Sequence, residues 1–287
     1  MDFNSKMGYS EQDYQLLKEH QLDKKYVDNS ISDIKEYVAN ALVSQKSGSM
    51  LRIDDVSPFD NTVTVNVSAV GDNVPSKIYQ FGRNILNPTP WTTPSTRHGV
   101  TYTYLPDEDC FLINGTATAN GGPIKDSPLF YALGSGFTIS LKYISGSVTV
   151  PANKFASFHL GKVDTATEPA PNFFSCGLQN SDNKTPVKFC DKNYLKASWF
   201  YVETGVVFEN YKIRLQVECN NSATAYEQYT APVELTPNAD GNVTVARENV
   251  CTFAVKTPGT LSAKYNRDIN KAFDELKQAI ISLGGNV

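Results

Sequence analysis

The sequence predicts a mainly β protein, a β-sandwich or barrel with an α-helix at each end of the chain. Three observations support this class. Period-two strands fill the middle of the chain, turn signals separate them, and the hydrophobic period changes to that of a helix near both ends. Many short antiparallel strands with one buried face are typical of sandwiches and barrels.

The first fifty residues favour a helix. From residue 8 to residue 44 there is no proline and no internal glycine, and apolar residues recur with the 4-3-4-3 spacing of a coiled-coil seam. The seam residues are Val27, Ile31, Ile34, Val38 and Ala41. A helix this short is marginal alone, and β-branched residues at both seam positions favour three or more helices. We therefore expect identical helices to meet around a symmetry axis.

The middle of the chain, from about residue 51 to residue 260, predicts strands. The clearest runs lie at 62–67, 100–104, 137–143 and 211–217, where apolar and polar residues alternate. Turn chemistry lies between them, at Asn114-Gly115, Gly121-Gly122, Ser145-Gly146-Ser147 and Asp240-Gly241-Asn242. Asn114 and Gly115 in particular predict a tight turn between two strands.

The last segment predicts a second helix with a narrow apolar stripe. Asn266 or Asp268 would cap its start, and Gly284-Gly285 would end it. The stripe consists of Ile269, Phe273, Leu276, Ile280 and Leu283. We expect this stripe either to join the oligomer or to dock on the β body.

Seven segments of the middle region form an ordered set of motifs, in chain order Asn84–Asn87, His98–Tyr104, Ile113–Ala119, Ser135–Ser140, Ser198–Val202, Tyr211–Glu218 and Ala223–Tyr229. Together they resemble the jelly-roll module of tail, fibre and baseplate-associated proteins of phages that infect Firmicutes. The segments Tyr265–Phe273 and Ile281–Gly285 are similar to the end of the same proteins, and Lys25–Ile31 is similar to the start of short fibre stalks. The stretch 171–192 departs from the pattern and is expected to be a loop-rich insertion.

The resemblance implies a fold and a setting. It implies a helical attachment and trimerisation segment at 1–50, a β linker at 51–80, a jelly-roll β-sandwich at 81–232, a β-rich connector at 233–264 and a helix at 265–287. The setting is a virion assembled in the host cytoplasm, in which a homotrimer contacts other virion proteins. Neither the resemblance nor the motifs supply a catalytic residue.

Composition and charge exclude other classes. The 287 residues carry 26 Lys and Arg against 30 Asp and Glu, a formal net charge of −4 without the basic concentration that nucleic acids require. No apolar run approaches the length of a membrane span, and the first residues lack the layout of a signal peptide. We expect a soluble product made without export, with no nucleic-acid partner and no membrane insertion.

Aromatic residues are the candidates for ligand contact. Trp91 lies in a loop rich in proline and threonine, where a large ring is hard to bury, and Phe173 and Phe174 lie in the insertion, as does Phe189. The alternative for these residues is packing against the sandwich or a neighbouring chain. Trp199, in a dense apolar strand, is expected in the core.

No catalytic, metal or cofactor site is expected. The five cysteines lie at least 14 residues apart and form no pair typical of zinc sites. The acidic run at 107–109 favours a solvated turn, because adjacent carboxylates point in different directions, although a calcium ion there stays possible. The resemblance, together with the two seams, implies a trimeric virion protein of fibre, baseplate or receptor-binding type, whose jelly roll is a candidate for binding host surface glycans. The alternatives are a capsid-associated fibre or decoration protein without glycan binding and, ranked last, an envelope polysaccharide depolymerase.

Overall fold

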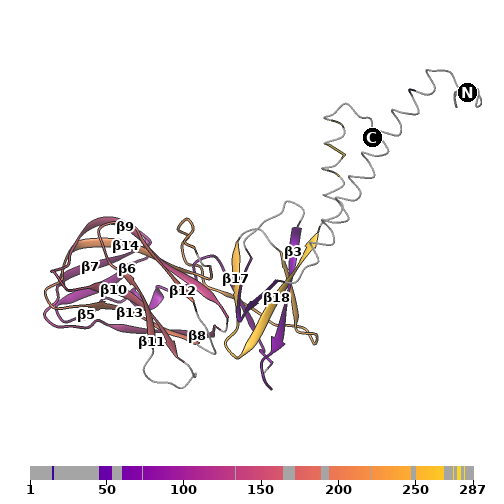
Figure 1. Cartoon of the computed structure of the whole chain (residues 1–287), viewed down its shortest axis with the longest axis horizontal. Helices are drawn as coiled ribbons and strands as arrows, with labels where there is room; N and C mark the ends of the chain where they lie inside the picture. The colour runs from indigo at the N-terminus through magenta and orange to yellow at the C-terminus, as the bar shows by residue number, and fades with distance from the viewer. Residues whose placement is uncertain are drawn as a thin grey trace, which may run out of the picture.

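The computed structural model shows a mainly β protein with two lobes (Figure 1). It describes residues 45–53, 60–72, 74–132, 134–163, 172–188, 194–220, 222–246 and 250–267, with isolated positions 15, 274, 277, 278 and 281. Among these residues, no helix has the length and apolar composition needed to cross a bilayer. Both expected helical seams lie outside the described residues, namely Val27, Ile31, Ile34 and Val38, and Ile269, Phe273, Leu276 and Ile280.

The larger lobe is a sandwich of two antiparallel sheets. The six-stranded sheet has the order β12-β9-β14-β7-β6-β5 and the four-stranded sheet the order β11-β10-β13-β8. The strands of the first sheet are β5 (Ser95–Arg97), β6 (Val100–Leu105), β7 (Cys110–Thr116), β9 (Gly136–Thr149), β12 (Asn183–Lys188) and β14 (Val207–Glu218). The strands of the second are β8 (Ile124–Tyr131), β10 (Ala156–Val163), β11 (Asn172–Gly177) and β13 (Tyr194–Val202). The expected runs at 100–104, 137–143 and 211–217 are confirmed as strands.

The chain passes repeatedly from one sheet to the other. From β7 to β10, consecutive strands alternate between the two sheets, and β14 returns to lie between β7 and β9. Eight strands in the orders β7-β14-β9-β12 and β8-β13-β10-β11 form the paired arrangement typical of a jelly roll. Almost all of these pairings are remote in sequence, so the order of the strands depends on the whole stretch.

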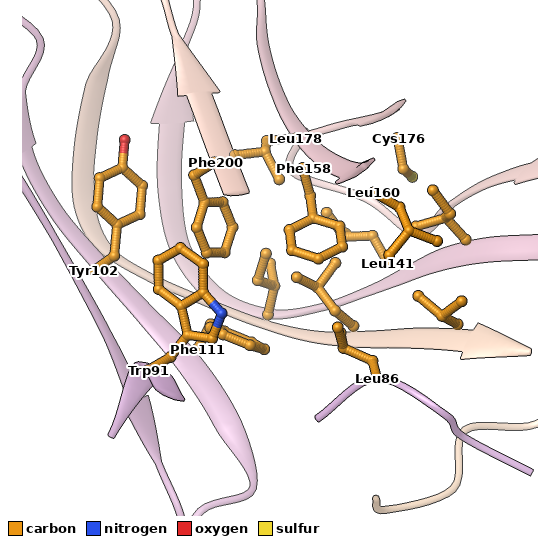
Figure 2. Close-up of a cluster of buried hydrophobic side chains, with 14 of the residues drawn as sticks. Leu86, Trp91, Tyr102, Phe111, Leu141, Phe158, Leu160, Cys176, Leu178 and Phe200 are labelled. Carbon is orange, nitrogen blue, oxygen red and sulfur yellow. The ribbon is translucent and has the colours of Figure 1, made fainter. Parts of the chain in front are cut away.

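The sandwich core contains a cluster of aromatic rings packed beside aliphatic side chains (Figure 2). Period-two alternation turns Phe158 and Phe200 inward, and Trp91 enters from the short 3-10 helix η1 (Thr89–Trp91). The centroids of the Trp91 and Phe200 rings are 5.0 Å apart in an edge-to-face arrangement, and the Trp91 indole nitrogen donates to Ser198 Oγ at 3.4 Å. This packing fixes the loop that carries Trp91.

The smaller lobe joins segments from both ends of the described chain. One sheet, in the order β1-β18-β3-β16, contains β1 (Gln45–Gly48), β3 (Asp60–Ala69), β16 (Asn242–Ala246) and β18 (Gly259–Arg267). The other, in the order β15-β4-β17-β2, contains β2 (Met50–Ile53), β4 (Ile78–Phe81), β15 (Val233–Leu235) and β17 (Cys251–Ala254). The stretches expected as a linker and a connector therefore pair with each other.

The β15-β4-β17-β2 sheet is shared by two hydrophobic cores. One of its faces, with Ile53 and Phe253, belongs to the core of the smaller lobe, and the opposite face, with Met50 and Phe81, belongs to the sandwich core. All four residues of β17 are buried, as expected for a strand covered on both faces. We call this sheet the shared sheet.

Two local expectations are corrected. Asn114 and Gly115 do not form a tight turn, because both belong to β7 and pair with β6. Gly115 has φ +117, and a Cβ there would lie 2.1 Å from the Gly99 carbonyl oxygen, so close backbone approach explains the glycine. The stretch 171–192 is also not simply a loop, since it supplies β11 and β12, one edge strand for each sheet of the sandwich.

Candidate functional site

The outer face of the four-stranded sheet carries a row of aromatic side chains. Because Phe158, Leu160 and Phe200 point into the core, the residues next to them in each strand point outward. These are His159 of β10, which lies directly opposite Trp199 of β13, and Tyr201, which lies opposite Ser157. Phe173 of the edge strand β11 lies opposite Gly161.

Five rings form a continuous row of contacts on this side of the sheet, which we call the aromatic face. Its members are Phe155, His159, Phe173, Trp199 and Tyr201. The His159 centroid lies 4.4 Å from that of Phe173, 5.0 Å from that of Trp199 and 5.7 Å from that of Tyr201. Phe155 extends the row by stacking on Tyr201, with centroids 5.1 Å apart and planes 18° apart. Such pairs stabilise each other beyond their buried area, so the rings hold one another in place.

The aromatic face is open to solvent at its edges. Phe155 is 49% exposed and Phe173 is 54% exposed, and Ile124, opposite Trp199 on β8, is also 54% exposed. Asp126 is exposed two residues after Ile124 and shares its face by strand alternation. A cluster of large exposed apolar side chains beside a carboxylate is typical of a binding surface, since monomeric proteins rarely leave such surfaces uncovered.

His159 forms the base of the aromatic face. Its side chain is 2% exposed, and its Nε2 shares a hydrogen bond with Ser157 Oγ on the same strand. Its Nδ1 has no hydrogen-bond partner among the described residues. Burial lowers the pKa of His159 to about 4, so the ring is neutral near pH 7.

The structure separates the expected ligand residues. Phe173 lies on the aromatic face and stays a candidate. Phe174 points the other way and packs against the sandwich core, with the Lys162 ammonium 5.3 Å from its ring centroid. For Trp91 the structure supports the alternative of packing in the sandwich, because the indole is completely buried and presents no surface to a ligand. The premise that a ring in this loop is hard to bury was wrong. Phe189 lies outside the described residues.

Sequence reasoning missed His159, Tyr201 and Phe155 as members of the face. The signal was present in the alternation, since Trp199 and Tyr201 flank Phe200 in one strand and must share the face opposite to it. Trp199 was expected in the core. It is buried at 8% exposure, but against the rings of the outer face. A strand with large apolar residues at consecutive positions needs cover on both faces, which predicts either a second layer or a binding surface.

Asn84, in the first of the segments that carry the resemblance, has a structural role. The Asn84 side chain donates to the carbonyls of Leu215 and Glu227 and accepts from the amides of Leu86 and Val217. It therefore satisfies its full hydrogen-bonding capacity while it joins the segment before η1 to β14 and to the crossing segment at 222–232.

The acidic run at 107–109 is also structural. Asp109 Oδ1 accepts hydrogen bonds from the hydroxyls of Tyr104 at 2.6 Å and Tyr226 at 3.0 Å, and its Oδ2 lies 3.8 Å from Arg214 Nε. Glu108 pairs with Lys212. Burial and the neighbouring Asp109 carboxylate raise the pKa of both tyrosines, which keeps them as donors. The run forms the expected turn, in which Asp107 and Glu108 are exposed. Asp109 alone departs from that expectation, because protein partners hold its carboxylate.

The described residues contain no cluster of three or more histidine, cysteine or acidic side chains suited to a metal ion. Cys110 and Cys176 are buried free thiols, and the side chains of Cys219 and Cys251 are buried as well. Burial raises the pKa of the Cys176 thiol to about 11, which disfavours the reactive thiolate.

Comparisons with known proteins add little. No family model matches the chain, and no curated protein matches it. A structure of infectious bursal disease virus, Gt strain, is similar at 10% identity over 83% of this chain and 72% of that chain, with a TM-score of 0.20. A structure of the Gx strain is similar at 9% identity over 83% of this chain and 87% of that chain, with a TM-score of 0.16. Scores this low do not establish a shared fold. The chain's own architecture defines a mainly β protein whose sandwich displays an aromatic surface.

Proposed function

We propose that the chain is a trimeric structural protein of a bacteriophage virion, of fibre, baseplate or receptor-binding type, whose jelly-roll sandwich binds a host surface saccharide. The observation that carries the binding function is the aromatic face on the outer surface of the β11-β10-β13-β8 sheet. The virion setting and the trimer come from the sequence resemblance and from the seam of Val27, Ile31, Ile34 and Val38.

A saccharide suits this surface because a sugar ring has an apolar face of C–H groups and a rim of hydroxyls. Phe173 and Phe155 offer exposed rings on which the apolar face packs. Asp126 and Ser175, the latter directly opposite His159, offer oxygens to the hydroxyls at the margin of the rings. The arrangement provides binding without placing two carboxylates across a substrate, which a depolymerase would require.

The test is a glycan array, or sedimentation with host cell walls, of the wild-type protein and Phe173→Ala. We expect the substitution to reduce binding about tenfold or more, since one stacked ring is removed from the contact. Ile144→Ala is the matched control, because Ile144 is 40% exposed on β9 of the other sheet. It should bind like the wild type.

Two outcomes would contradict the proposal. Equal binding by Phe173→Ala and the wild type would place the saccharide elsewhere on the protein. No binding by any variant, combined with self-association that Phe173→Ala abolishes in sedimentation velocity, would make the aromatic face a contact between copies. The protein would then be a fibre or decoration protein without glycan binding.

A further inference from the structure

A second site lies between the shared sheet and the sandwich. A cavity of about 250 Å³ opens there, walled by Phe81 of β4, Phe130 of β8, Leu160 of β10 and Leu195 of β13. These four side chains are 4–7% exposed, whereas deeper core residues such as Phe158 and Phe200 are fully buried. The four side chains of the wall therefore reach solvent-accessible space, whereas the deeper part of the core is closed to solvent. Leu86 also lines the cavity, and both Leu86 and Leu160 lie at the end of the core away from Tyr102 (Figure 2).

The lining of the cavity is mainly apolar, with Asn87 as a neutral polar member and two charged residues, Lys256 and Glu234, at its rim. Lys256, just after the shared sheet, places its ammonium 4.3 Å from the ring centroid of Tyr79 and 5.8 Å from that of Phe130. Tyr79 and Phe130 both line the cavity, so the ammonium lies against the wall. Among the described residues, Lys256 makes no ion pair within 4 Å. Glu234, opposite Tyr79 in the β15–β4 pair, lies on the same rim.

We propose that this cavity binds an anionic amphiphile with a single aliphatic chain, such as a medium-chain carboxylate. An apolar cavity of about 150 Å³ already stays dry and takes up a small apolar molecule, so this larger one accommodates an aliphatic chain. We expect an anionic head group because two rings hold the Lys256 ammonium over the cavity wall. Among the described residues, no carboxylate lies within 4 Å of this ammonium. The site is separate from the aromatic face, and its existence does not depend on saccharide binding.

The sign of the head group gives a sharp test by titration calorimetry on the full chain. The probes are decanoate, decanol and decyltrimethylammonium, each below its aggregation concentration. We expect decanoate to bind more tightly than decanol, and decyltrimethylammonium to bind most weakly. Lys256→Met should weaken decanoate about five- to tenfold and Glu234→Gln should strengthen it about two- to fivefold, with no change for decanol.

Controls separate the cavity from general surface charge. Lys154→Met, in an exposed turn after β9, should leave decanoate binding unchanged. Leu195→Phe, which fills the cavity, should weaken decanoate and decanol alike, with folding verified by thermal melting. Because Lys256 and Glu234 are charged groups on the rim, their variants decide the question even where the filled variant does not fold.

The proposal is overturned by absence of decanoate binding to the wild type. It is equally overturned if Lys154→Met weakens decanoate as much as Lys256→Met, or if decyltrimethylammonium binds best and the two rim variants shift affinity in the opposite directions.

Discussion

The buried indole of Trp91 shows how a single residue fixes the sandwich. Its ring contacts Phe200 and Phe111, with centroids 5.0 Å and 6.2 Å away. Trp91→Ala should lower the free energy of unfolding by about 3–5 kcal/mol because it leaves a cavity in the core. Chemical denaturation measures this loss, and Trp91→Phe should lose clearly less. Unchanged stability of Trp91→Ala would mean that the indole does not belong to the core.

His159 makes the stability of the sandwich depend on pH. Burial lowers its pKa from 6.5 to about 4, so the folded protein binds this proton less readily than the unfolded chain does. The stabilising effect is complete above pH 6.5 and is lost as the pH falls toward 4, with a limit of about 3 kcal/mol.

Thermal melting of the wild type and His159→Phe between pH 7 and pH 4 checks this prediction. The wild type should lose more stability than the variant in that window, since only the wild type must protonate a buried ring. Parallel profiles for the two proteins would show that His159 does not titrate there.

At the scale of single residues, the sequence identified aromatic candidates for ligand contact but did not predict which of them are buried. Phe173 was identified as a ligand candidate and lies on the aromatic face, whereas Trp91, for which ligand contact and packing against the sandwich were both left open, is buried. The difference arises because local composition around Trp91 indicates a loop but says nothing of which distant strands cover it. Phe111 and Phe200, which enclose the indole, are 20 and 109 residues further along the chain.

At the scale of elements, strands with clear alternation were predicted well. The runs at 62–67, 100–104, 137–143 and 211–217 all lie in strands, because alternation directly reports one buried face. β11 and β12 were missed because edge strands have fewer partners and weaker patterns. The tight turn at Asn114 and Gly115 was wrong because glycine there accommodates a neighbouring backbone.

The N-terminal seam carries the prediction for the trimer. Ile31→Asp combined with Ile34→Asp would place like charges at the symmetry axis of the proposed trimer, and we expect that trimer to dissociate while the β lobes stay folded. Multi-angle light scattering at micromolar concentration measures the mass, and far-ultraviolet circular dichroism follows the strands. A wild-type monomer, or a double variant that stays trimeric with unchanged melting, would contradict this role.

At the scale of the whole molecule, a buried ion pair links the two lobes. Arg52 Nη1 on β2 lies 2.6 Å from Glu218 Oε2 on β14, and their side chains are 7% and 0% exposed. Burial acts to raise the pKa of Glu218, but hydrogen bonds from Thr224, Arg52 and Gln216 outweigh it and hold the pKa below its usual value. The carboxylate therefore stabilises the fold above the unfolded pKa of about 4.3, and this contribution is lost as the pH falls through the lower folded value.

Arg52→Met should lower the free energy of unfolding by about 3–5 kcal/mol, because it leaves the Glu218 carboxylate buried without its cation. The double variant Arg52→Met with Glu218→Gln should lose less than the single one, since glutamine carries no charge. Urea denaturation of the four proteins in the cycle measures the coupling. Additive losses would show that the two side chains do not depend on each other.

The shared sheet has a consequence for exchange of parts between proteins. A chimera that takes only residues 81–232 would inherit the sandwich without β2, β17 and most of β4, and so would lose the layer that covers one side of its core. The buried side chains of Phe130 and Leu86 would then face water. The segment that can be exchanged between proteins and still fold is therefore the sandwich together with both of its flanking segments. We expect recombination boundaries that preserve folding to lie outside Gln45 and Arg267.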